Sequence, residues 1–129
     1  MIVDWPQGFD EWLDHLEVRA DQGDRRASRQ LALVTAELQV LARLREKPAV
    51  ETATLRRVRQ RRRYEIWRLS HPYEAGVAMR VICWFSDEDA VVVAAFAADK
   101  AKAGDVFYDQ IGTKADAIID QYRRESRRS

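Results

Sequence analysis

Residues 79–97 read MRVICWFSDEDAVVVAAFA, two apolar runs separated by a short acidic stretch. Met79 to Phe85 and Val91 to Ala98 are rich in β-branched and aromatic residues, which favours strands. Neither run alternates between apolar and polar residues, so each strand is expected to be covered on both faces. The connection Ser86-Asp87-Glu88-Asp89 is short and predicts an antiparallel hairpin. We therefore expect these two strands at the centre of an antiparallel sheet.

Two more strands are predicted upstream of this hairpin. Tyr64 to Ser70 has strand composition, and the turn HPYEAG (71–76) joins it to the strand that follows. Ile2 to Trp5 is a short apolar run stopped by Pro6, which predicts a first strand. The later three strands form an antiparallel meander because their connections are short.

Between the first strand and the meander, apolar residues recur at helical spacing. Residues 9–20 form one amphipathic helix that ends at Gly23, and Asp24 is expected to cap a second helix that Pro48 stops near Lys47. The short connection predicts an antiparallel helical hairpin on one face of the sheet. The other face needs a second layer or a partner.

The C-terminal third predicts further helix. Asp105 to Ile111 is a short helical piece, Gly112 interrupts it, and Thr113 with Asp116 resembles a capping box for a final helix through Arg124. We thus predict one α+β domain over residues 1–129, with a mainly antiparallel sheet, an N-terminal helical hairpin and a C-terminal helix.

Composition excludes several classes of protein. No apolar run approaches the ~20 residues of a membrane helix, so a cytoplasmic protein without a membrane partner is expected. The single cysteine, Cys83, lies in an apolar run and is expected in the core, with a reactive thiol as the alternative. His15 and His71 are far apart, so no zinc-type cluster is expected.

Charge is unevenly distributed along the chain. The net charge is +1, yet residues 52–83 carry eight arginines against Glu65 and Glu74, a net charge of +6. Such a segment can form a basic patch for an anionic partner, or it can be a solvated charge run.

The order of elements resembles that of the RelE/ParE superfamily of bacterial type II toxins, especially its HigB-like, phage-derived branch. Four segments carry the resemblance: LRRVRQRRRYEIWRL (55–69), VAMRVICWF (77–85), AVVVAAFAADK (90–100) and GDVFYDQI (104–111). The resemblance implies a single toxin domain that cleaves mRNA without a metal or cofactor, often on the ribosome. It also implies a neutralising antitoxin, expected to be a helix-turn-helix protein. The alternatives are a member of the same fold without nuclease activity, such as a gyrase poison, or a protein-interaction module.

The resemblance also implies candidate catalytic residues. Arg80 matches the family's strand arginine, which would stabilise the charge of the transition state, although a salt bridge to Glu65 is the alternative. Lys100 matches the strand-end lysine. Phe107 falls at the position of a helical tyrosine, for which Tyr108 substitutes if the register shifts by one residue. His71 has a suitable side chain for acid–base catalysis, with a turn-stabilising role as the alternative.

A second set of residues is expected to bind RNA. Arg61, Arg62, Arg63 and Arg68 would contact phosphates, since they precede or lie within the first strand of the meander. Trp67 and Trp84 would offer stacking platforms for unpaired bases if they share one open face of the sheet. The alternative is that both tryptophans belong to the core.

Overall fold

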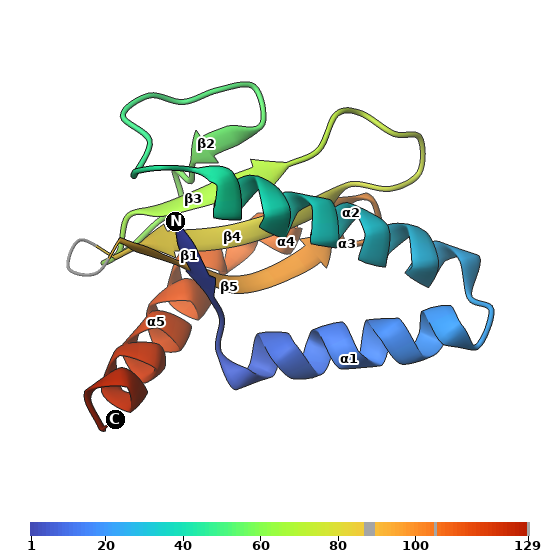
Figure 1. Cartoon of the computed structure of the whole chain (residues 1–129). Coiled ribbons are helices and arrows are strands. Elements are labelled where there is room, and N and C mark those ends of the chain that lie inside the picture. Colours follow the sequence, from blue (N-terminus) through green and yellow to red (C-terminus); the bar gives the residue numbers. More distant parts are fainter. Residues whose placement is uncertain (87–89, 105, 129) are drawn as a thin grey trace.

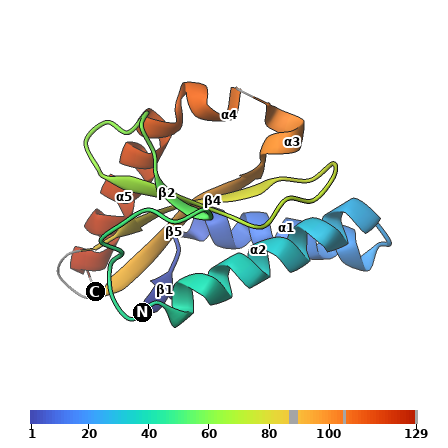
Figure 2. The same cartoon turned by 90° about the horizontal axis from the view of Figure 1, so that it is seen from above.

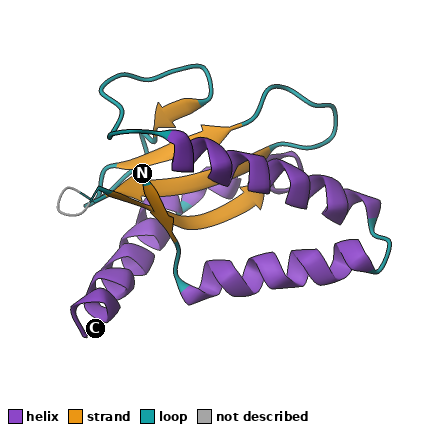
Figure 3. Ribbon diagram, in the orientation of Figure 1, coloured by secondary structure: helices purple, strands orange, loops and turns teal. Residues whose placement is uncertain are grey.

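A five-stranded sheet with helices on both faces forms the protein (Figures 1 and 3). The computed structural model describes residues 1–86, 90–104 and 106–128. Its elements in chain order are β1 (Ile2–Asp4), α1 (Gln7–Asp21), α2 (Arg25–Arg43), β2 (Leu55–Arg57), β3 (Ile66–Ser70), β4 (Met79–Phe85), β5 (Val91–Asp99), α3 (Lys100–Ala103), α4 (Val106–Asp109) and α5 (Ile111–Arg128). The predicted α+β class and arrangement are confirmed.

The strand order in the sheet is β1-β5-β4-β3-β2. β3, β4 and β5 form the predicted antiparallel meander, whereas β1 joins the far edge parallel to β5. The three-residue strand β2 was not predicted, because its sequence LRR lacks a strand pattern. It pairs antiparallel to β3 and makes the other edge of the sheet. Asp87, Glu88 and Asp89 of the predicted hairpin connection lie outside the described residues.

One face of the sheet is covered by the helical hairpin of α1 and α2, as Figure 2 shows from above. The Asp24 side chain caps α2 by accepting a hydrogen bond from the Ala27 N–H at 3.0 Å, as predicted. α2 ends at Arg43, earlier than the predicted stop near Lys47. Cys83 is fully buried in this core, which confirms its expected place, and burial raises the pKa of its thiol.

The other face is covered in part by α5, which lies on the opposite side of the sheet from α1 and α2 (Figure 2). Ile111, Ala115 and Ile119 of α5 are buried against residues of the central strands, among them Ile82 and Phe96. Of the two alternatives for this face, a second layer or a partner, the chain therefore supplies the second layer itself over the part that α5 covers.

The start of α5 differs from the prediction. Gly112 lies within the helix and does not interrupt it. The Asp116 carboxylate accepts hydrogen bonds from the backbone N–H groups of Arg63 and Tyr64, so it anchors the loop before β3 and does not form a capping box. Asp105, at the start of the predicted short helix, lies outside the described residues.

In the part of the chain that the structure describes, none of the helices combines the length and apolar character needed to cross a membrane.

Candidate functional site

Three arginines form a diagonal row across β2, β3 and β4. The register places Arg56 directly opposite Arg68, and Arg68 opposite Ile82. Arg80 lies two residues before Ile82 and therefore on the same face. Ile82 belongs to the core beneath α5, so this is the α5 side of the sheet. Arg68 and Arg80 remain half-buried, which places them at the end of the face that α5 leaves accessible.

Tyr108 and Lys100 join this row from the segment after the sheet. The Nη1 atom of Arg68 donates a hydrogen bond to the Tyr108 hydroxyl at 2.8 Å. The Nζ atom of Lys100 lies 5.1 Å from the centroid of the Tyr108 ring, within the range of a cation–π contact. Two cations thus flank one phenol, and three of the predicted site residues come together. The side chain of Phe107, the alternative for the helical tyrosine, lies outside the described residues.

Asp99 fixes the position of Lys100. Its buried carboxylate caps α3 through the Ala101 N–H at 3.0 Å and accepts the Ala78 N–H at 2.9 Å. It also accepts hydrogen bonds from Arg26 and Gln30 of α2. The end of β5, the start of β4 and the start of α2 are therefore joined beside Lys100.

Arg80 does not form the salt bridge that was its alternative role. Glu65 pairs with Arg57 at 3.2 Å, and the residue opposite Arg80 is Ser70. Arg80 donates from Nη1 to the Met79 carbonyl, while its buried Nε has no partner. The buried Nε of Arg68 is also without a partner, and neither arginine forms an ion pair with a described residue. Half-buried arginines whose buried Nε has no hydrogen-bond partner favour binding of an anion.

Two cavities lined by described residues adjoin the arginine row. The larger, of about 250 Å³, reaches Arg68 and Tyr108 and has walls from the segment around β2. The smaller, of about 140 Å³, reaches Arg80 and His71 and lies beneath the loop between β3 and β4. The residues that line the larger cavity are Glu51, Arg56, Arg57, Val58, Arg59, Gln60, Arg68 and Tyr108.

His71 supports the loop between β3 and β4. Its Nε2 accepts the Met79 N–H at 3.0 Å, and its Nδ1 lies 2.7 Å from the Pro72 carbonyl, to which it donates. Both ring nitrogens are therefore occupied by partners in the loop and at the start of β4. This geometry favours the turn-stabilising role over the catalytic one.

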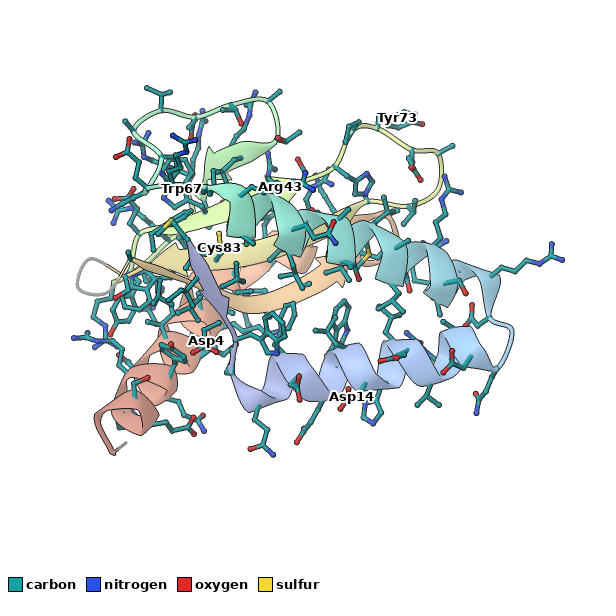
Figure 4. The ribbon with its side chains drawn as sticks, in the orientation of Figure 1. Asp4, Asp14, Arg43, Trp67, Tyr73 and Cys83 are labelled. Carbon is teal, nitrogen blue, oxygen red and sulfur yellow. The ribbon has the colours of Figure 1, made fainter. Side chains whose placement is uncertain are left out.

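The two tryptophans do not share a face of the sheet. Trp67 lies opposite Cys83 on the side of the helical hairpin, whereas Trp84 lies opposite Ile66 on the side of α5. Trp67, labelled in Figure 4, is fully buried. The Arg57 guanidinium covers its ring at 4.7 Å from the centroid. The prediction that Trp67 stacks on RNA is therefore wrong, because successive side chains of a strand point to opposite faces. Trp84 is partly exposed and lies edge-on to Tyr64 at 5.6 Å.

The arginines of the basic segment before β3 lie in different environments. Arg63 is held on α5 by an ion pair with Asp120, and it also lies over the Tyr64 ring at 5.2 Å. Arg61 and Arg62 are exposed in the loop and form no ion pair with the described part of the chain. Of the four predicted phosphate ligands, only Arg68 belongs to the arginine row.

Several residues of the site were not predicted. Glu51 lines the larger cavity, and the unpredicted strand β2 positions Arg56, an arginine of the basic segment, beside Arg68. Tyr73, at the tip of the loop between β3 and β4, is 91% exposed and lines the smaller cavity (Figure 4). The place of Arg56 in the arginine row follows from the pairing of β2 with β3, which the sequence pattern did not predict. Among the described residues, no cluster of three or more His, Cys, Asp or Glu side chains could hold a metal ion.

Comparisons of the chain with family models, with curated proteins and with solved structures find no match.

Proposed function

We propose that this protein is an endoribonuclease that cleaves mRNA without a metal, as the resemblance to the RelE/ParE toxins implies. The observation that carries the proposal is the convergence of Arg68, Arg80, Lys100 and Tyr108 at the accessible end of one sheet face. Two of its guanidinium groups have a buried Nε without a partner.

This arrangement suits the cleavage of a phosphodiester by the neighbouring ribose 2′-hydroxyl. The 2′-hydroxyl gives up its proton as its oxygen bonds to phosphorus, and the 5′ oxygen takes up a proton as its bond to phosphorus breaks. The products are a 2′,3′-cyclic phosphate and a free 5′-hydroxyl. Arg68, Arg80 and Lys100 supply positive charge for the additional negative charge of the phosphorane. The Tyr108 hydroxyl, held by Arg68, is the group that can transfer a proton.

Cleavage of an RNA oligonucleotide in the presence of EDTA tests the proposal. We expect cyclic phosphate and 5′-hydroxyl ends from the unmodified protein. Arg80→Ala should reduce the rate by ~10²–10³, the usual effect of losing one charge-stabilising donor. Tyr108→Phe should reduce it by ~10²–10⁴, the usual contribution of acid–base catalysis.

Arg19→Ala is the matched control, since Arg19 is exposed on α1. Equal cleavage by Arg80→Ala and Arg19→Ala would contradict the site. If the protein instead causes DNA damage in cells without cutting RNA, the gyrase-poison alternative applies.

The partners follow from the same proposal. The protein acts in the cytoplasm on mRNA, in association with the ribosome, and an antitoxin of the helix-turn-helix class restrains it. Expression in bacteria, alone and together with any small open reading frame found next to its gene, tests this: growth arrest should occur only when the protein is expressed alone.

A further inference from the structure

The larger cavity shares two residues with the proposed cleavage site. Arg68 and Tyr108 are half-buried at its inner side, together with the buried Val58. The other lining residues are exposed, so the cavity opens to solvent beside the arginine row. A group bound here would be adjacent to a phosphate held by Arg68 and Arg80.

The cavity contains hydrogen-bond donors that no described residue uses. The side chains of Arg56, Arg59 and Gln60 make no hydrogen bond or ion pair within the described part of the chain. Arg57 is different, since it bonds to Glu65 and to the Ala49 carbonyl while lying over Trp67. The Arg57 side chain is therefore held in place at the edge of the cavity. The donors without a partner are those of the Arg56, Arg59 and Gln60 side chains.

One anchored acceptor also faces the cavity. Glu51 Oε1 accepts the backbone N–H of Arg57 at 2.9 Å. The second carboxylate oxygen has no hydrogen-bond partner among the described residues. A fixed carboxylate repels a phosphate, so the cavity suits a group that presents acceptors to the arginines and a donor to Glu51.

We propose that this cavity recognises a guanine base next to the cleaved phosphate, an inference that rests on the proposed function for its position in the RNA. Guanine presents O6 and N7 as acceptors, which arginine binds in bidentate fashion. Its N1–H and N2–H₂ groups are donors for the free oxygen of Glu51. Adenine instead places its N6 amino group, a donor, where the arginines need an acceptor.

The test is equilibrium binding of 3′-GMP, 3′-AMP, 3′-CMP and 3′-UMP, measured by calorimetry. These ligands contain no bond to cleave, so binding is measured independently of nuclease activity. We expect 3′-GMP to bind at least about 10-fold more tightly than the other three nucleotides. This difference lies within the usual discrimination of one bidentate contact.

Glu51→Gln is the decisive variant. Glutamine retains an oxygen for the Arg57 N–H, while its amide nitrogen replaces the free acceptor with a donor. We expect 3′-GMP binding to weaken by about 10-fold while 3′-AMP binding does not fall. Glu46→Gln is the control, since Glu46 is exposed and does not line the cavity.

The outcomes separate this inference from the proposed function. Selective 3′-GMP binding by a protein that cuts no RNA would support the guanine site and overturn the nuclease. RNA cleavage with equal binding of the four nucleotides, or with a preference for another base, would overturn the guanine site alone.

Discussion

Arg56 and Arg68 lie directly opposite each other on β2 and β3, so that two guanidinium groups share one face of the sheet. Neither forms an ion pair with a described residue. Like charges directly opposite each other on neighbouring strands destabilise a sheet by roughly 0.2–1 kcal/mol. An anion between them would remove this cost.

Arg56→Gln should therefore stabilise the free protein by up to about 1 kcal/mol at low salt, because it removes the repulsion. The same substitution should weaken binding of single-stranded RNA and reduce the slope of log affinity against log salt by about 0.7, the value for one lost phosphate contact. Urea unfolding and binding titrations at several salt concentrations measure both effects. Arg43→Gln, at the exposed end of α2, is the control. An unchanged salt slope in Arg56→Gln would show that Arg56 contacts no phosphate.

Gly112→Ala should destabilise the protein by about 1–3 kcal/mol, the usual cost of overpacking. A Cβ at this position would lie 2.3 Å from the Gln60 carbonyl oxygen and 2.9 Å from Arg62 Cγ, so the loop before β3 must move. Because Gln60 and Arg59 line the larger cavity, nucleotide binding should weaken as well. Gly8→Ala is the control, since a Cβ there meets nothing within 4 Å, and helix propensity predicts a gain of up to about 1 kcal/mol. Equal stability of the two variants, measured by thermal unfolding, would contradict the close approach.

Glu37 is a buried acid on the face of α2 that contacts the sheet, and both of its carboxylate oxygens lack a partner among the described residues. Burial raises its pKa to about 9, although the charge of Arg80 opposes the shift. The folded protein therefore holds a proton that the unfolded chain releases above a pH of about 4.5. Stability should fall as pH rises from there towards 9, by up to about 1.4 kcal/mol per pH unit.

Glu37→Gln should remove this pH dependence, since glutamine does not titrate. Glu37→Met should also stabilise the protein at pH 7 by about 1–3 kcal/mol, because it removes unsatisfied buried oxygens. Urea unfolding between about pH 5 and about pH 9 measures the stability of both variants. The exposed Glu17→Gln variant should behave like the unmodified protein. A slope that persists in Glu37→Gln would refute the assignment to Glu37.

Asp99 should make the protein less stable as pH falls, whereas Glu37 makes it less stable as pH rises. Burial alone raises its pKa, but hydrogen bonds from Ala78, Gln30, Arg26 and Ala101 outweigh burial and hold the pKa below its ordinary value. A carboxylate with a lowered pKa contributes stability above its unfolded pKa of about 3.9 and loses it as pH falls through the folded pKa.

Asp99→Asn should therefore cost about 1–3 kcal/mol at pH 7 and weaken the dependence of stability on acid pH. An amide cannot accept all four hydrogen bonds, so Lys100 should also lose its fixed position and RNA cleavage should slow. Thermal unfolding from neutral to acid pH tests the first effect, with the exposed Asp21→Asn as control. The idea fails if both variants lose the same stability.

The sequence predicted most of the fold because hydrophobic periodicity is a local signal. The bounds of β4 agree with the prediction at both ends, and Asp24 was identified as the cap of α2. Within α2, however, the buried positions include Gln30 and Glu37, which no apolar pattern could reveal. Burial of these residues depends on which side of the helix meets the sheet.

By itself, the sequence determined the α+β order, the helical hairpin, the meander and the concentration of arginine before β3. Tertiary structure decided which arginines act together, because strand register is a long-range relationship between segments. Pairing of β2 with β3 brought Arg56 to Arg68, while the alternation of side chains sent Trp67 into the core and left Arg68 and Arg80 on the accessible face. The docking of α5, which no local pattern specifies, covered the rest of that face and confined the candidate site to one end of the sheet.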